Sequence, residues 1–111
     1  TRRFARAGAI AYVHFRNVRG KVPHYVETFV DDGDVDMAAI VRVLHEEGYE
    51  GVLVPDHVPE LDCAAPWHAG HAYTVGYMKA LIAQVAALDG RQARAAEEAA
   101  RQPERIAAQQ R

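Results

Sequence analysis

The stretch Val52-Leu53-Val54-Pro55-Asp56-His57 decides the fold that we expect for this chain. Its apolar residues predict a buried strand over residues 51–55, which ends at a proline. An acid and an imidazole follow directly, at the carboxyl end of the strand. In folds built from parallel strands and helices, the loops at this end form the ligand site. The stretch therefore predicts an α/β fold with polar side chains gathered at a strand end.

An earlier stretch repeats this arrangement. Residues 8–15 form a nearly continuous apolar run, which favours a strand buried on both faces in a parallel sheet. His14 lies near the end of this run, and Arg16 and Asn17 follow it. Because the carboxyl ends of parallel strands lie at one edge of a sheet, we expect His14 and Asp56 to converge.

An amphipathic helix is predicted between the two strands. Its apolar stripe has helical spacing and consists of Met37, Ile40, Val41 and Leu44. Asp34 or Asp36 can cap the first turn by accepting a backbone hydrogen bond, and Gly48 is a suitable residue to end the helix. Strand, helix and strand together predict a βαβ unit with a right-handed crossover.

The remaining segments complete a one-domain plan. Residues 17–33 predict a folded active-site loop, because long connections in compact domains are usually functional. After a second loop, a helix is expected over residues 71–88, with an apolar stripe of Val75, Met78, Ile82 and Val85, ending at Gly90. We interpret residues 1–90 as the folded unit, with a short basic lead-in over residues 1–7, and residues 91–111 as a polar helical tail.

Composition narrows the functional class. The chain has 111 residues, half of them hydrophobic, and a formal net charge of −2, so it has no basic excess for nucleic-acid binding. Cys63 is the single cysteine, which rules out an internal disulfide. Without a long apolar run or a signal-like start, we expect no membrane partner and a cytoplasmic location. The absence of an initiator methionine suggests a piece of a longer protein.

The residue types at the two strand ends suit a metal ion. An imidazole from His14 and a carboxylate from Asp56 are ligands for a divalent first-row cation such as Mn²⁺, Fe²⁺ or Zn²⁺. Two ligands are too few for a tight site, so others would have to come from elsewhere. The alternative for His14 is a packed, hydrogen-bonded core histidine.

Two neighbours of these ligands can do further chemistry. His57 can act as a general acid or base, or can orient a ligand through a hydrogen bond. Arg16 shares a strand face with His14, and its planar guanidinium can hold a substrate carboxylate in two hydrogen bonds. The alternative for Arg16 is an ion pair with an acid of the 17–33 loop.

The second loop is dense in aromatic and imidazole groups. His68, His71, Tyr73 and Tyr77 could all supply a proton, and their spacing does not choose among them. Cys63 is more consistent with a packed, unreactive thiol than with a metal ligand. There is no glycine-rich phosphate motif, no paired Cys-x-x-Cys and no serine for a serine-based triad.

At these residues the sequence resembles mannonate dehydratase, a bacterial lyase of hexuronate breakdown. Three short motifs carry the resemblance: residues 14–18 (His-Phe-Arg-Asn-Val), 33–37 (Gly-Asp-Val-Asp-Met) and 55–57 (Pro-Asp-His). The family has a (β/α)₈ TIM barrel of the xylose-isomerase-like kind. The resemblance implies that this chain is the C-terminal portion of such a barrel, with two parallel βα units and a helical tail.

The resemblance also assigns roles. His14 and Asp56 match two ligands of the Mn²⁺ or Fe²⁺ ion, and His57 matches a catalytic histidine. Arg16 matches a substrate-site arginine, with Asn17 expected beside it. Tyr73 is our choice for the family's catalytic tyrosine, and His68 is its rival. The remaining ligands, a cysteine and a histidine, lie on earlier strands, and Cys63 is not at that cysteine's position.

The implied reaction removes water from D-mannonate to give 2-keto-3-deoxy-D-gluconate. A barrel takes eight strands and typically about 250 residues, so this chain alone is expected to be incomplete and inactive. We expect a sugar-acid substrate and a homo-oligomer. Two alternatives stay open: a non-catalytic α/β fragment that self-associates, and a metal-dependent sugar isomerase or epimerase on the same barrel.

Overall fold

Two parallel strands form the centre of the fold. The computed structural model describes residues 1–109, with side chains described for residues 1–100. Strand β1 (Tyr12–Phe15) pairs in parallel with β4 (Val52–Pro55), in a register that runs from Tyr12 opposite Val52 to Phe15 opposite Pro55. The predicted strands and their parallel pairing are confirmed, although β1 begins at residue 12 rather than at residue 8.

Helix α2 (Met37–Glu46) connects these strands as expected. Its N-cap is Asp36, whose carboxylate accepts a hydrogen bond of 2.9 Å from the backbone N–H of Ala39. The helix ends before Gly48, which adopts a left-handed φ of +68° that favours glycine. Of the predicted stripe, Met37, Val41 and Leu44 are buried and Ile40 is half-buried. The chain therefore has the mixed α/β character that its sequence indicates.

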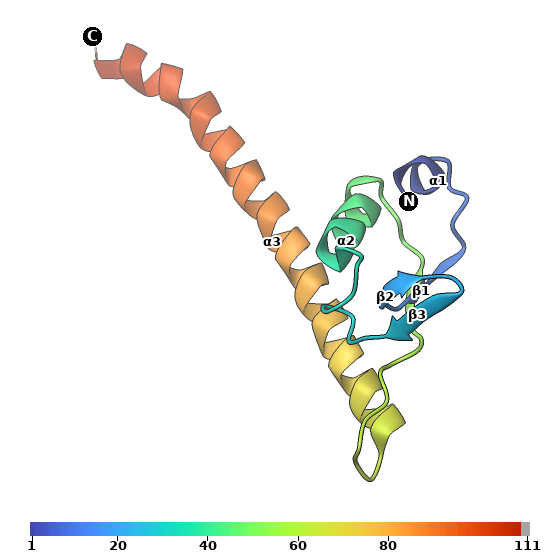
Figure 1. The fold of residues 1–111 in the computed structure, drawn as a ribbon. Coiled ribbons are helices and arrows are strands. Elements are labelled where there is room, and N and C mark those ends of the chain that lie inside the picture. Colours follow the sequence, from blue (N-terminus) through green and yellow to red (C-terminus); the bar gives the residue numbers. More distant parts are fainter. Residues whose placement is uncertain (110–111) are drawn as a thin grey trace.

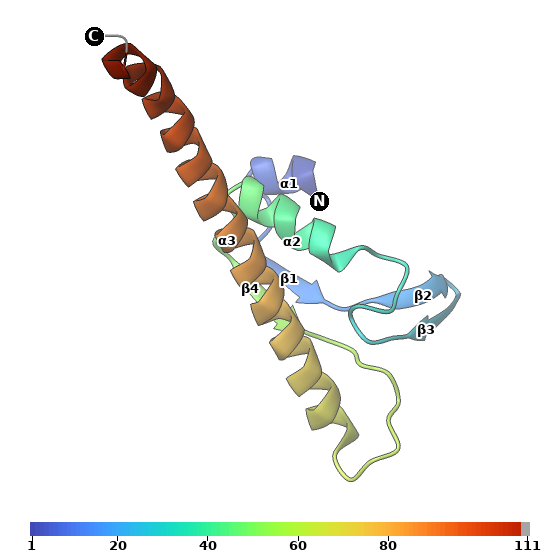
Figure 2. The same cartoon turned by 90° about the vertical axis from the view of Figure 1, so that its left-hand side faces the viewer.

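Helices α2 and α3 (Pro66–Gln109) cover one face of the strand pair (Figure 2). The core that they share consists of Phe15, Val30, Met37, Val41, Met78, Leu81 and Val85, with Leu53 packed against it. Alternate residues point to the opposite face of a sheet, and there Tyr12 and Val52 are 60% and 63% exposed. The sheet thus has one packed face and one open face.

The connection after β1 contains a β-hairpin that the sequence analysis treated as a loop. Strand β2 (Val18–Lys21) pairs antiparallel with β3 (His24–Glu27), and Val22 and Pro23 form the turn. Gly20 has φ +98°, and a Cβ there would lie 2.6 Å from the carbonyl oxygen of His24. The hairpin projects away from α2 and α3 (Figure 1) and returns the chain to the end of β1.

Helix α3 differs from its prediction at both ends. It begins at Pro66 rather than His71, and it continues through Gly90 instead of ending there. Residues 91–100 are helical and exposed, whereas residues 110 and 111 of the predicted tail lie outside the described residues. The C-terminal part of α3 extends beyond the other elements in both views (Figures 1 and 2). The proposed division into residues 1–90 and 91–111 remains a prediction.

The buried stripe of α3 also differs from the predicted one. Met78 and Val85 are buried as expected, but Val75 and Ile82 are exposed. The helix instead buries Thr74 and Leu81. Among the described residues, no helix combines the length and the apolar character that spanning a membrane requires.

The basic N-terminus forms a short helix instead of a simple lead-in. Helix α1 (Arg2–Arg6) lies against the end of α2, where Arg2 pairs with Glu46 and both Arg2 and Arg6 pair with Glu47. The two arginines hold the pKa of Glu47 at about 2, below its ordinary value of 4.5, and the hydrogen bond from Arg6 is the largest cause.

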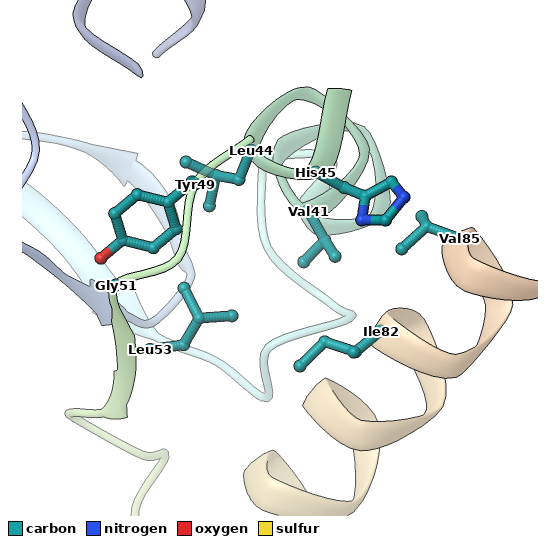
Figure 3. Close-up of a pocket in the computed structure, with 8 residues that line it drawn as sticks. All are labelled: Val41, Leu44, His45, Tyr49, Gly51, Leu53, Ile82 and Val85. Atoms are coloured by element: carbon teal, nitrogen blue, oxygen red, sulfur yellow. The ribbon is translucent and has the colours of Figure 1, made fainter. Parts of the chain in front are cut away.

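A hollow of about 150 Å³ lies between α2, β4 and α3. Figure 3 shows that side chains from all three elements face it, among them Val41, Leu53 and Ile82. Beside it, the ring of His45 lies 2.6 Å from Asp89 and ties α2 to α3. The lining of the hollow is mostly apolar, so we interpret the hollow as a loosely packed part of the interface between these elements.

Candidate active site at the carboxyl end of the parallel strands

His14 and Asp56 converge at the strand ends. Nδ1 of His14 lies 3.5 Å from Oδ2 of Asp56. The register explains this closeness, because His14 is opposite Val54 and Asp56 follows β4 directly after Pro55. The convergence predicted from the sequence is confirmed. An imidazole and a carboxylate from neighbouring strands now face one space.

Arg16 lies beside this pair and between two carboxylates. Its guanidinium is 3.1 Å from Oε1 of Glu27 and 3.6 Å from Oδ2 of Asp56, and it lies over the ring of Tyr25 at 5.8 Å. Burial opposes the positive charge, but the hydrogen bond with Tyr25 and the two carboxylates outweigh it and raise the pKa of Arg16. Arg16 therefore does pair with a loop acid, and it does so within reach of the strand-end site.

His57 lies near the same two acids. Its ring nitrogens lie 3.8 Å from Oδ1 of Asp56 and 3.9 Å from Oε1 of Glu27. These distances are longer than a hydrogen bond, so the ring is near both carboxylates without being fixed by either. The half-exposed imidazole is accessible to a ligand.

A cavity of about 670 Å³ opens beside Glu27. It lies between the hairpin and the loop that follows His57, and its wall includes Val58, Glu60 and Trp67. Cavities of this size admit a small polar ligand. Of the residues around the strand ends, Glu27 lines this cavity.

The strand-end pair also fits a metal ion in part. Two ligands of one cation, each about 2.1 Å from it, lie about 3.0–3.5 Å apart, which matches the separation of His14 and Asp56. Within the described part of the chain, no three His, Cys, Asp or Glu side chains form a cluster that could hold a metal. His14 and Asp56 can supply two ligands, and a stable site needs more.

Comparison with known proteins decides the family. The family model of D-mannonate dehydratase (UxuA) matches residues 1–92. This chain belongs to the mannonate dehydratase family. A mannonate dehydratase of Enterococcus faecalis is 43% identical to it over 51 residues, which cover 43% of this chain and 14% of that protein. The matched stretch is thus a small part of the length of the curated relative.

The resemblance to the mannonate dehydratase family led us to predict Tyr73 as its catalytic tyrosine, and this role stays a prediction. The hydroxyl of Tyr73 donates a hydrogen bond of 2.6 Å to Asp31, and its ring packs against Phe29 and Tyr77. The hydrogen bond to Asp31 is the main cause of the raised pKa of Tyr73. The structure therefore places Tyr73 against the segment before α2. Its rival His68 is exposed in the first turns of α3.

Asn17 has a structural position that the sequence analysis did not foresee. Its amide donates to the carbonyls of Val30 and Val35, at 2.9 and 2.8 Å, and accepts from the backbone N–H groups of Val18 and Val35. The side chain is 1% exposed, and these four bonds use its full hydrogen-bonding capacity. Asn17 therefore holds the chain between β1 and α2 in place, and the substrate-binding role expected for it stays a prediction.

Two further residues, Glu27 and His71, make contacts near the strand ends that the sequence analysis did not predict. Glu27 reaches Arg16 because the hairpin brings it back to the end of β1. Predicting that hairpin from the sequence would have identified Glu27 as a neighbour of Arg16. The ring of His71 has Nε2 2.8 Å from the backbone oxygen of Asp56 and Nδ1 2.9 Å from that of Trp67. For the contact between His71 and Trp67, the signal in the sequence was their spacing of four residues, which places the two side chains on one helix face.

Proposed function

We propose that this chain contributes part of the active site of a working mannonate dehydratase. The observation that carries the proposal is the 3.5 Å approach of His14 to Asp56 at the carboxyl ends of two parallel strands. Family membership supports the lyase class, and the motif residues Arg16 and His57 lie around the same pair. The rest of the enzyme would supply the missing metal ligands.

The proposal includes the barrel. The β1–α2–β4–α3 order equals two consecutive βα units, and both helices lie on one face of the strands. In a (β/α)₈ barrel the other face looks into the interior, where neighbouring strands cover it. Here that face carries His14 together with the exposed Tyr12 and Val52. An interior position would explain why the apolar side chains of Tyr12 and Val52 are uncovered here.

Each strand-end residue has a role in this proposal. His14 and Asp56 would hold Mn²⁺ or Fe²⁺, which when bound stabilises negative charge on the substrate's oxygens. Arg16 would bind the carboxylate of D-mannonate through its planar fork. His57 would transfer a proton, because its half-exposed imidazole lies 3.8 Å from Asp56 and is not fixed by a hydrogen bond.

The reaction needs one base and one acid. The base takes the proton from C2 of D-mannonate, and the C3 hydroxyl leaves as water with a proton from the acid. The enol that remains becomes 2-keto-3-deoxy-D-gluconate. His57 fills one of these roles. Tyr73 fills the other once its hydroxyl leaves Asp31, and His68 is the alternative. We further propose a cytoplasmic homo-oligomer.

Loss of D-mannonate with Mn²⁺ present tests the function. The assay uses this chain alone and this chain combined with the preceding strands of the family's barrel. We expect turnover only in the combination, and we expect Asp56→Asn to abolish both turnover and Mn²⁺ binding. A folded combination that never dehydrates D-mannonate would favour the non-catalytic fragment. If the combination interconverts sugars instead, the isomerase or epimerase alternative holds.

The same combination identifies the second proton-transfer residue. We expect Tyr73→Phe to lower kcat by about 10²–10⁴-fold, the usual contribution of general acid–base catalysis, while His68→Gln changes it little. The opposite pattern would assign the role to His68.

A further inference from the structure

Arg16 is shared between two carboxylates. It lies 3.1 Å from Oε1 of Glu27 and 3.6 Å from Oδ2 of Asp56. That oxygen of Asp56 is also the one that lies 3.5 Å from Nδ1 of His14. A single carboxylate oxygen therefore faces both the guanidinium and the imidazole that would share a cation with it.

A divalent cation and a guanidinium compete for such an oxygen. The two positive charges repel each other at short range, and the repulsion is stronger where water is partly excluded. The side chain of Asp56 is only 23% exposed. Cation binding by His14 and Asp56 therefore disfavours the contact between Arg16 and Asp56, and Arg16 needs another partner.

Glu27 has the capacity to be that partner. Its Oε1 already contacts Arg16, whereas its Oε2 is buried and has no hydrogen-bond partner among the described residues. A carboxylate binds a guanidinium best when both of its oxygens accept. A small shift of Arg16 toward Glu27 would pair the unsatisfied oxygen and free Asp56 in one movement.

We propose that Glu27 is a positioning residue that draws Arg16 away from Asp56, so that His14 and Asp56 can take up a divalent cation. This inference rests on the metal site of the proposed function. It goes beyond that function by giving a purpose to the hairpin, which carries Glu27 to Arg16. Glu27 acts through Arg16 and does not itself contact the cation.

Binding of Mn²⁺ to the whole 111-residue chain, measured by NMR, tests this inference. Mn²⁺ is paramagnetic and broadens the amide signals of nearby residues, so that weak binding is measured residue by residue without turnover. The same spectra show whether each variant is folded. Glu27→Gln keeps the size of the side chain and removes its charge. Glu60→Gln is the matched control, because Glu60 is an exposed acid that lines the same cavity.

We expect Glu27→Gln to weaken the apparent Mn²⁺ affinity about tenfold, the order of magnitude for one close charge pair, and Glu60→Gln to change it less than about twofold. Arg16→Met should strengthen Mn²⁺ binding, because it removes the competing cation. The double variant Glu27→Gln/Arg16→Met should bind like Arg16→Met alone, because Glu27 acts only through Arg16.

Several results would overturn the inference. Unchanged affinity in a folded Glu27→Gln chain removes the role of Glu27 and leaves the metal site standing. An equal loss in the Arg16→Met background means that Glu27 acts on the cation directly. A wild-type chain that binds no Mn²⁺ overturns this inference, whereas the proposed function is judged separately by turnover of the combination. If Glu27→Gln does not fold, Arg16→Met decides alone, and binding that fails to strengthen overturns the idea.

Discussion

Gly33 and Asn17 are packed so closely that no side chain fits between them. A Cβ on Gly33 would lie 2.2 Å from Oδ1 of Asn17, and Asn17 is held by its bonds to Val30 and Val35. Asn17 therefore cannot move aside without breaking buried hydrogen bonds. This contact joins the end of β1 to the segment that leads into α2, and it sets the path of the chain behind the site.

Gly33→Ala should consequently lower the free energy of unfolding by about 1–3 kcal/mol, the usual cost of overpacking. Gly90→Ala is the control, because a Cβ there meets nothing within 4 Å and the residue is helical. It should raise stability by roughly 0.5–1 kcal/mol. Urea denaturation of both variants measures the difference, and midpoints that shift alike would contradict the close packing.

His71→Leu should destabilise the chain by about 1–2 kcal/mol, because it removes a hydrogen bond to the backbone oxygen of Asp56 and leaves that acceptor unpaired. His68→Leu, on the same helix but exposed, should stay within about 0.5 kcal/mol of wild type. Thermal unfolding distinguishes the two variants. Equal effects of the two substitutions would mean that the hydrogen bond from His71 to the strand end contributes nothing to stability.

Acid should weaken the contact between α1 and α2. The pKa of Glu47 is about 2 in the folded chain against 4.5 ordinarily, so the unfolded chain takes up the proton first as pH falls. The ionised group therefore stabilises the fold above pH 4.5, and this contribution is lost progressively as pH falls toward 2.

Glu47→Gln should accordingly be less stable than wild type at neutral pH and should lose less stability on acidification to about pH 3. High salt should reduce the difference between the two chains, because these ion pairs are near the surface. Glu50→Gln, at an exposed acid nearby, is the control. Parallel urea-midpoint curves for wild type and Glu47→Gln across this pH range would disprove the linkage.

The open face of the strand pair should cause self-association of the isolated chain. Tyr12 and Val52 are opposite each other and exposed. Val52→Lys should shift sedimentation toward the monomer by placing a charge on this face. Val75→Lys, on the exposed side of α3, should leave sedimentation unchanged. Wild-type chain that remains monomeric at every concentration would refute the expectation.

The sequence predicted the parts of the fold that depend on local chemistry. Asp36 caps α2 because a carboxylate pairs with free backbone N–H groups, and Gly48 ends it because glycine tolerates positive φ. The convergence of His14 and Asp56 was also predictable, since parallel strands present their carboxyl ends at one edge. Each of these predictions needed only a residue type and its place along an element.

The missed features depend on tertiary packing. Nearly every side chain of the hairpin is exposed, so residues 18–27 show no apolar alternation, and Gly20 and Pro23 are typical of loops. The helix-favouring residues after Gly90 outweigh the cost of about 1 kcal/mol for glycine, and so α3 continues. Apolar side chains lie on more than one side of α3, and packing against the rest of the fold selects the buried ones, such as Leu81.

The pairing register of β1 and β4 has a consequence for tolerated insertions and deletions. A slip by one position would turn His14 toward the side where Phe15 and Leu53 pack, and its imidazole would no longer meet Asp56. Length changes in the connection over residues 57–65 leave this pairing untouched. Deleting one residue from either four-residue strand would separate His14 from Asp56 while barely altering the composition of the chain.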